Sequence, residues 1–138
     1  MIVAVSGHFD PLHRGHIDNI REASKLGSHL IVIMNNDTQI VKRNGSVFMP
    51  LHERISRLFK KCPFITGVVV SIDTDNTVAE TLKLIRPNIF AKGGDRTMDN
   101  MPQSELDACE EVGCRVIYGV GRKLNSSTAI RERVARLR

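Results

Sequence analysis

Aromatic residues are scarce in this chain of 138 residues, at 4% of the composition, with no tryptophan and one tyrosine. Proteins that bind single-stranded nucleic acid stack bases on aromatic side chains interleaved with positive charge. The net charge of +5 and the sequence pI near 9.4 nevertheless make an anionic partner plausible. The shortage of stacking surfaces argues against nucleic acid as that partner.

Long apolar runs and paired cysteines are also missing. The longest apolar stretches, such as "LIVIM" at residues 30–34, fall far short of the roughly 20 residues that cross a bilayer. The N-terminal stretch has neither a basic start nor a cleavage site, so we expect a cytoplasmic protein with no membrane partner. Cys62, Cys109 and Cys114 form no CxxC pair, and an odd number is a poor disulfide framework. We expect these cysteines to be reduced and mostly buried.

Short apolar runs rich in β-branched residues recur along the chain. Their apolarity is too continuous for half-solvated strands, which predicts strands buried on both faces. The five runs cover residues 2–6, 29–34, 67–72, 88–92 and 115–119.

Segments of helical period separate these runs. Apolar residues at helical spacing predict helices over residues 14–26, 51–62, 77–86, 103–112 and again after residue 130. Thr77 and Glu80 have the spacing of a capping box, and Pro87 would stop the helix that this box opens. The polar stretch at residues 35–47 is the best candidate for a mobile loop.

The alternation of strands and helices predicts the fold. Parallel strands joined by right-handed crossovers give an α/β fold, a doubly wound five-stranded parallel sheet with helices on both faces. We expect one domain over residues 1–138. Ligands of such sheets bind beyond the carboxyl ends of the strands, where the strand order reverses. The turns that follow the strands therefore carry the candidate site.

The stretch "SGHFDPLHRGHID" at residues 6–18 follows the first strand directly. Gly7 allows a close approach of the backbone to a ligand. His13 and His16 are three residues apart at the start of a predicted helix, so their rings lie on one side of its first turn. Free amide N–H groups and the helix dipole favour a phosphate at the same place. We interpret the stretch as an anion clamp.

Other interpretations of the two histidines stay open. A zinc site would need a third ligand, and Asp10 would have to complete it. A hydrolase would need a nucleophile paired with a histidine, and no GxSxG motif is present. A purely structural role, in which the histidines cap the helix, is the third alternative.

The segment "GHFDPLHRGHI" resembles the HxGH signature of the cytidylyltransferase-like nucleotidyltransferases, here His13-Arg14-Gly15-His16 after the turn Gly7-His8-Phe9-Asp10. The stretches "VIMNNDTQIVKRNG", "PLHERISRL", "FAKGGDR" and "NSSTAIRE" fall in the order and spacing of members that act on heptose 1-phosphate or glycerol 3-phosphate. The resemblance implies a Rossmann-like fold and transfer of CMP or AMP from CTP or ATP to a sugar, polyol or alcohol phosphate, with release of pyrophosphate. It also implies Mg²⁺ bound with the triphosphate, and a homodimer.

The resemblance further implies site residues. The catalytic residues would be His13, His16 and Lys42. Lys42 would lie in the loop after the second predicted strand, where its neighbour Arg43 could take its role. The nucleotide-binding residues would be Gly7, His8, Phe9, Asp10, Gly15, Arg54, Gly93, Asp95, Ser126, Ser127 and Thr128. Plainer interpretations are a solvated cation for Lys42, a surface ion pair for Arg54, a tight turn at residues 92–96 and helix N-caps at residues 126–128.

Two departures from the family pattern concern the acceptor. His8 stands where the glycerol and choline members carry a small residue, and Arg122 is shifted relative to a family arginine. The alternative function is a non-catalytic nucleotide- or nucleic-acid-binding domain on the same fold. The partial GxG in "YGVGRKL" is only a weak indication of dinucleotide binding, because no GxGxxG follows.

Overall fold

Strands and helices alternate along the chain in the computed structural model, which describes residues 1–93 and 97–121. The first half contains β1 (Ile2–Gly7), α1 (Arg14–Ser24), β2 (His29–Met34), α2 (Asp37–Asn44) and α3 (Leu51–Lys61). The second half contains β3 (Gly67–Val70), α4 (Ala79–Ile85), β4 (Ile89–Gly93), the 3-10 helix η1 (Met98–Asn100), α5 (Gln103–Val112) and β5 (Arg115–Val120).

The five strands form one parallel sheet in the order β3-β2-β1-β4-β5. The chain runs outward from β1 to β3, then returns to place β4 on the other side of β1. The strand order therefore reverses between β1 and β4, which opens a crevice at their carboxyl ends. The predicted doubly wound sheet is confirmed.

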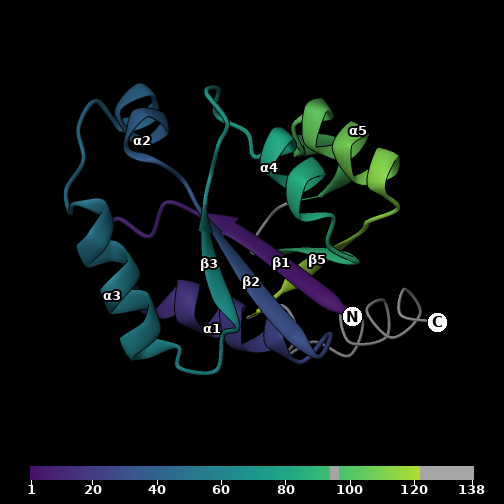
Figure 1. Ribbon diagram of the computed structural model, residues 1–138, viewed down its shortest axis with the longest axis horizontal. Helices are drawn as coiled ribbons and strands as arrows, with labels where there is room; N and C mark the ends of the chain where they lie inside the picture. The colour runs from purple at the N-terminus through teal and green to yellow at the C-terminus, as the bar shows by residue number, and fades with distance from the viewer. Residues whose placement is uncertain (94–96, 122–138) are drawn as a thin grey trace.

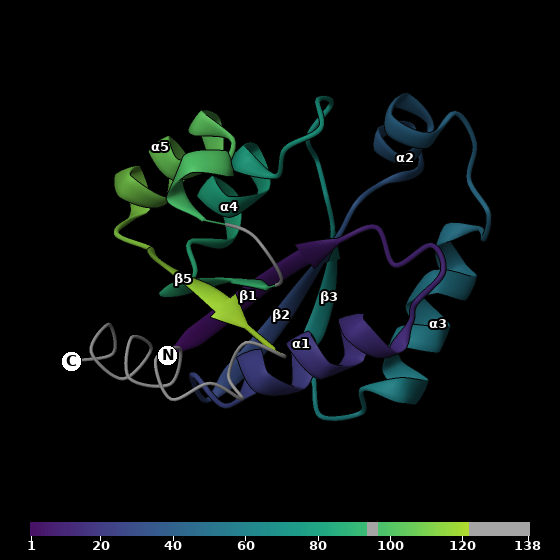
Figure 2. The ribbon, with the colours of Figure 1, turned by 180° about the vertical axis from the view of Figure 1, so that it is seen from behind.

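Helices cover both faces of the sheet, as predicted. Figures 1 and 2 show α4 and α5 together on one face and α1 on the other. One apolar core joins α1 and α3 to β1 and β2 through residues such as Val3, Ile20 and Leu58. A second core joins α4 and α5 to the opposite face through residues such as Leu82 and Phe90. The crevice lies between these two layers.

Helix α2 replaces most of the loop that we predicted at residues 35–47, and that prediction is wrong for residues 37–44. The Asn36 side chain accepts a hydrogen bond from the Gln39 amide at 2.9 Å, and the Gln39 side chain accepts one from the Asn36 amide at 3.1 Å. This capping box starts the helix. Gly45, with φ of 87°, ends it. The polar composition concealed the helix because its buried face is only Gln39 and Ile40.

The start of α4 also differs from the prediction, since Thr77 and Glu80 form no capping box. Asp73, which is buried, accepts hydrogen bonds from the amides of Glu80 at 2.8 Å and Thr81 at 3.1 Å. The helix begins at Ala79, two residues later than predicted. Its cap comes from six residues before its first residue, which no local capping pattern reveals.

The state of the cysteines agrees with the prediction from the sequence. Cys62, Cys109 and Cys114 are free and buried, as predicted. Within the described ranges, each helix is too short or too polar to cross a membrane.

Candidate active site

A cavity of about 390 Å³ lies at the carboxyl ends of β1 and β4, where the strand order reverses. Both helical layers contribute to its wall, because α1 lines one side and the segments around α4 and α5 line the other. The lining residues are Val5, Ser6, Gly7, His8, Phe9, His16, Asn19, Ile20, Asn35, Arg43, Asn76, Val78, Ala91, Lys92, Gly93, Pro102, Glu105 and Val120.

His13 and His16 cap the first turn of α1. The Nδ1 atom of His13 accepts hydrogen bonds from the amides of Gly15 at 3.1 Å and His16 at 3.4 Å. The Nδ1 atom of His16 accepts one from the His13 amide at 3.2 Å. Because each Nδ1 is an acceptor, a neutral ring carries its proton on Nε2. The caps therefore leave each ring with an N–H donor, so helix capping and phosphate binding are compatible roles.

The two rings stack with their centroids 3.6 Å apart and an interplanar angle of 22°. They nevertheless line different spaces. His16 lines the cavity, whereas His13 lines a groove of about 560 Å³ between α1 and α3, beside Arg14, Arg57, Lys60 and Lys61. The predicted convergence of both histidines on one spot is thus only partly met: the rings are neighbours, and His16 is the one in the cavity wall.

The ring of Phe9 packs against the ring of His16. Phe9 is buried, lies edge-on to His16 with the ring centroids 5.0 Å apart, and has a φ of 51°. A Cβ atom at Gly7 would lie 2.8 Å from the Phe9 ring, so the close approach that requires this glycine is to Phe9. At Gly15 a Cβ atom would lie 3.0 Å from the His13 ring. The glycines make room for packed rings within the site itself.

Burial keeps the two histidines of the cavity neutral at pH 7. Desolvation is the largest cause that lowers the pKa of His16 to about 4, followed by the charges of His13 and His8. Burial also lowers the pKa of His8, assisted by the guanidinium groups of Arg43 and Arg54 and opposed by Asp10. A neutral His16 donates from Nε2 without requiring a positive charge.

The low pKa of His16 predicts how stability depends on pH. Between pH 6.5 and about pH 4 the unfolded chain binds a proton at this ring that the folded chain does not. The free energy of unfolding should therefore fall as the pH drops through this window, and the contribution of His16 should level off below it. Urea denaturation across a pH series measures this fall. It should be smaller in His16→Asn, and an unchanged slope in that variant would contradict the assignment.

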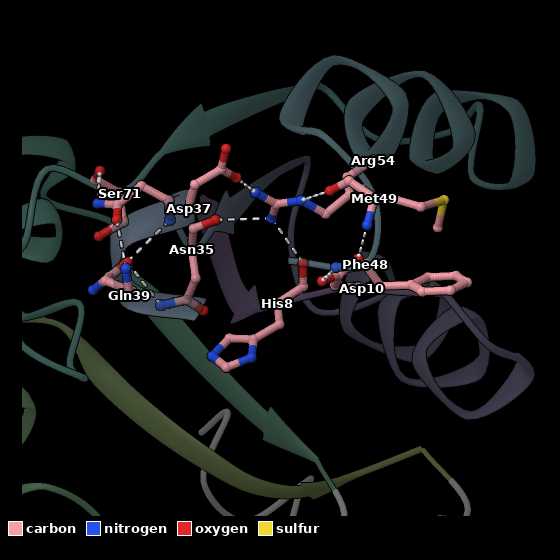
Figure 3. A network of polar contacts seen from close by, with 10 residues as sticks. His8, Asp10, Asn35, Asp37, Gln39, Phe48, Met49, Arg54 and Ser71 are labelled. Atoms are coloured by element: carbon pink, nitrogen blue, oxygen red, sulfur yellow. Dashed lines mark hydrogen bonds and ion pairs between the residues drawn. The ribbon is translucent and has the colours of Figure 1, made fainter. Parts of the chain in front are cut away.

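Asp10 anchors a loop instead of lining the cavity. Its two carboxylate oxygens accept hydrogen bonds from the amides of Phe48 at 2.7 Å and Met49 at 2.6 Å, as Figure 3 shows. The structure places this carboxylate outside the cavity wall, and the predicted contact with the nucleotide stays a prediction. Its position fixes the segment that leads from α2 into α3.

Arg54 occupies neither of the two places that the sequence suggested. Its side chain is fully buried, and the guanidinium donates to the carbonyls of His8 at 3.0 Å, Asn35 at 2.9 Å and Met49 at 3.3 Å. It also pairs with Asp37 at 2.5 Å. Figure 3 shows the guanidinium group between these segments, with the His8 ring directed away from it. Arg54 is therefore a positioning residue that ties together the ends of β1 and β2, and it is neither a surface ion pair nor part of the cavity wall.

Lys42 lies in α2, and its placement in a loop is a wrong prediction. Its Nζ atom donates to the carbonyl of Thr74 at 2.6 Å, and it does not line the cavity. The neighbouring Arg43, the alternative that the sequence left open, does line the cavity.

The end of β4 contributes Lys92 and Gly93 to the cavity wall. A Cβ atom at Gly93 would lie 2.5 Å from the Asn19 side chain and 3.0 Å from the Val120 carbonyl, so this position admits only glycine without rearrangement. The predicted contacts of Asp95, Ser126, Ser127 and Thr128, and the shifted Arg122, lie outside the described residues.

Six polar residues of the cavity were not predicted as site residues: Ser6, Asn19, Asn35, Asn76, Lys92 and Glu105. Asn19 follows His16 by three residues on α1, and Asn35 directly follows β2, so helical spacing and strand ends could have indicated both. Lys92 belongs to the "KGGDR" stretch that the sequence did single out. Glu105 in α5 carried no local signal. Within residues 1–93 and 97–121, no group of three or more His, Cys, Asp or Glu side chains could hold a metal ion.

Solved structures resemble this fold. A lipopolysaccharide core biosynthesis protein from Thermoplasma volcanium matches with a TM-score of 0.68 and 22% identity, over 88% of this chain and 97% of that one. A protein of unknown function from Archaeoglobus fulgidus matches with a TM-score of 0.66 and 23% identity, over 92% of this chain and 93% of that one. At these identities the likeness concerns the fold.

Sequence relatives include D-beta-D-heptose 1-phosphate adenylyltransferase of Bordetella bronchiseptica, which is 30% identical over 76% of this chain and 65% of its own length. Bifunctional protein HldE of Desulfatibacillum aliphaticivorans is 32% identical over 94% of this chain, and the same-named protein of Streptomyces coelicolor is 34% identical over 97%. The chain spans only 26% and 28% of the length of these two bifunctional relatives.

A family model described as cytidylyltransferase-like matches residues 4–133. This match includes both histidines at the start of α1, the end of β4 and the cavity between the two helical layers. The chain belongs to the cytidylyltransferase-like family.

Proposed function

We propose that the protein transfers a nucleoside monophosphate, CMP or AMP, from CTP or ATP to a phosphomonoester and releases pyrophosphate. The observation that carries this proposal is the neutral His16 in the cavity wall, with Nδ1 engaged in the helix cap and Nε2 left as a donor. The relative named as a heptose 1-phosphate adenylyltransferase favours an adenylyl group and a sugar phosphate among the possible substrates.

The proposed reaction needs no base from the protein. An oxygen of the acceptor phosphate, already anionic near pH 7, attacks the α-phosphorus of the triphosphate. A new P–O bond forms as the bond from the α-phosphorus to the oxygen that bridges to the β-phosphate breaks, and pyrophosphate leaves with that electron pair. The protein has to align two anions and stabilise the negative charge that develops between them.

The cavity supplies donors suited to that task. The Nε2–H of His16 would donate to oxygens at the α-phosphate, and the positive end of the α1 helix dipole favours an anion at the same place. Arg43 and Lys92 add positive charge to the same cavity wall. Lys92 is held near the end of β1 by a hydrogen bond of 3.4 Å to the Ser6 hydroxyl.

Mg²⁺ would accompany the triphosphate in this proposal. Both oxygens of Asp10 already accept amide hydrogen bonds. The donor set therefore suits a cation held mainly by phosphate oxygens and water, as is usual for Mg²⁺. Its chemistry would be to neutralise the triphosphate charge.

The remaining parts of the proposal rest on the sequence. Asp95 would contact a sugar hydroxyl, and Ser126, Ser127 and Thr128 would receive the β- and γ-phosphates. The free thiols of the three cysteines favour the reducing cytoplasm as the place where the protein acts. A homodimer would be the assembly, since two-fold symmetry is the commonest arrangement of soluble oligomers.

Pyrophosphate release tests the proposal. The protein would be incubated with Mg²⁺, each of the four ribonucleoside triphosphates, and a panel of sugar, polyol and amino-alcohol phosphates. We expect pyrophosphate only when a triphosphate and a phosphomonoester are present together, with ATP or CTP as the donor. A non-catalytic binding domain would release none in any combination and, if it binds nucleic acid, would lose affinity steeply as salt is raised.

A further inference from the structure

The side chain of Glu105 places a buried carboxylate in the wall of the cavity. It lies in the first turn of α5, and its side chain is only 5% exposed. One carboxylate oxygen, Oε2, accepts a hydrogen bond from the Val78 amide at 3.0 Å, next to the start of α4. The other oxygen, Oε1, is buried and has no hydrogen-bond partner among the described residues.

A structural role explains only one of the two oxygens of Glu105. Oε2 joins α5 to the segment before α4 by accepting the hydrogen bond from the Val78 amide, and Oε1 takes no part in that contact. A buried polar atom without a partner is rare in folded proteins, and it is the only such side-chain atom within residues 1–93 and 97–121. Because Glu105 lines the cavity, a ligand in the cavity is the natural source of the missing donor.

The charge of Glu105 indicates which part of a ligand it would contact. A carboxylate repels phosphate groups, so the phosphates belong near His16 of α1 and Arg43. His16 and Glu105 come from the two opposite helical layers, so they line the cavity from different sides of the sheet. The Glu105 side is therefore suited to an uncharged part of the ligand that donates a hydrogen bond.

We propose that Glu105 determines specificity by accepting, at Oε1, a hydrogen bond from a hydroxyl group of the bound ligand. This inference rests on the proposed function for the nature of the two ligands. A hydroxyl is the chemistry that they share, since the nucleotide carries a ribose and a sugar or polyol phosphate carries hydroxyls of its own. The two sources are distinguished by experiment.

The test compares Glu105→Gln with the wild type in calorimetric binding experiments on the full chain. Glutamine keeps the shape and an oxygen for the Val78 amide but removes the charge. The probes are ATP and CTP with their 2′-deoxy and 3′-deoxy analogues, and glycerol 3-phosphate and glucose 1-phosphate with ethyl phosphate as the phosphomonoester that lacks hydroxyls. Glu110→Gln is the matched control, since Glu110 is exposed on the same helix.

We expect Glu105→Gln to weaken binding of the hydroxylated ligand by about 10- to 100-fold, the range for hydrogen bonds to charged groups, and to leave the matching hydroxyl-free ligand nearly unchanged. A selective loss among the nucleotides identifies the ribose as the source, and a selective loss among the phosphomonoesters identifies the acceptor. Glu105→Asp, which retracts the carboxylate by one methylene, should show the same selectivity. Equal losses for both members of each pair, or no loss, would overturn the inference and leave Glu105 with a structural role alone.

The outcome is separable from that of the proposed function. A wild type that releases no pyrophosphate but shows the hydroxyl-selective loss in Glu105→Gln would disprove the transfer reaction and retain the ligand contact. The opposite result is turnover by the wild type together with equal discrimination, by the wild type and by Glu105→Gln, between hydroxylated and hydroxyl-free ligands. That result would retain the reaction and reject the role of Glu105.

Discussion

Replacing His16 by asparagine should lower kcat by about 100- to 1000-fold while leaving the affinity for the triphosphate within about tenfold. The asparagine oxygen sits on Cγ, as Nδ1 of histidine does, so it can still accept the hydrogen bond from the His13 amide. The variant therefore preserves the helix cap and removes only the Nε2–H donor. Steady-state kinetics by pyrophosphate release, together with nucleotide titration, measures both quantities.

His16→Gln is the complementary variant. Its side-chain amide nitrogen reaches farther, toward the position of Nε2, and can restore part of the lost donor while the cap is impaired. We expect His16→Gln to be faster and less stable than His16→Asn. His52→Asn on the exposed surface of α3 is the control and should change neither property.

A helix cap without catalytic function predicts the opposite order of effects. The asparagine variant would then keep full turnover, and the glutamine variant would lose only stability, by about 0.5 to 2 kcal/mol. If His13 and His16 act on one developing charge, His13→Asn should also slow turnover, and the double variant should lose less than the product of the single losses. Full turnover in both single variants would show that this turn is not the phosphate clamp.

Arg54→Met should reduce the free energy of unfolding by about 3 to 5 kcal/mol, because three carbonyl groups would each lose a hydrogen bond from a buried charged donor, at about 1 to 3 kcal/mol for each unsatisfied group. Methionine fills much of the same space, so the loss reports on hydrogen bonding more than on cavity formation. The carbonyls that would lose these donors are those of His8, Asn35 and Met49. Urea denaturation at pH 7 measures the loss.

Arg57→Met on the same helix is the matched control. Arg57 is exposed and pairs with Glu53 at 3.3 Å, so its removal should change the free energy of unfolding by less than about 0.5 kcal/mol. Equal effects in the two variants would mean that the contacts of Arg54 contribute no more than a surface ion pair. Arg54→Lys should also be destabilised, since a single ammonium group cannot donate in the several directions that a guanidinium can.

The fold was predictable where one physical signal dominates a segment. β2 and α5 begin and end at the predicted residues, because continuous apolarity and clear helical spacing leave few alternatives. α2 was missed because its buried face is small and its capping residues are as polar as those of a loop. The cap of α4 was missed because Asp73 reaches it from outside the helix.

A cavity lies where the turn after β1 predicted a site, but the orientation of individual side chains was not predictable from the sequence. Lys42 and Arg43 are adjacent in sequence, and only the helical geometry of α2 decides which of them meets the cavity. Arg54 was predicted to bind the nucleotide, with a surface ion pair as the plainer alternative, and its burial was missed because the carbonyls that surround it come from separate segments. The free carboxylate oxygen of Glu105 is a property of tertiary packing, and no sequence pattern contains it.

The packing beneath His16 has a consequence for the evolution of this site. Gly7 has no room for a side chain because the Phe9 ring would lie 2.8 Å from its Cβ, and the same ring supports His16 edge-on. A smaller residue at position 9 would tolerate alanine at position 7 but would withdraw that support. Positions 7, 9 and 16 should therefore covary among descendants of this chain, because a substitution at any one of them limits the residues that the other two can accept.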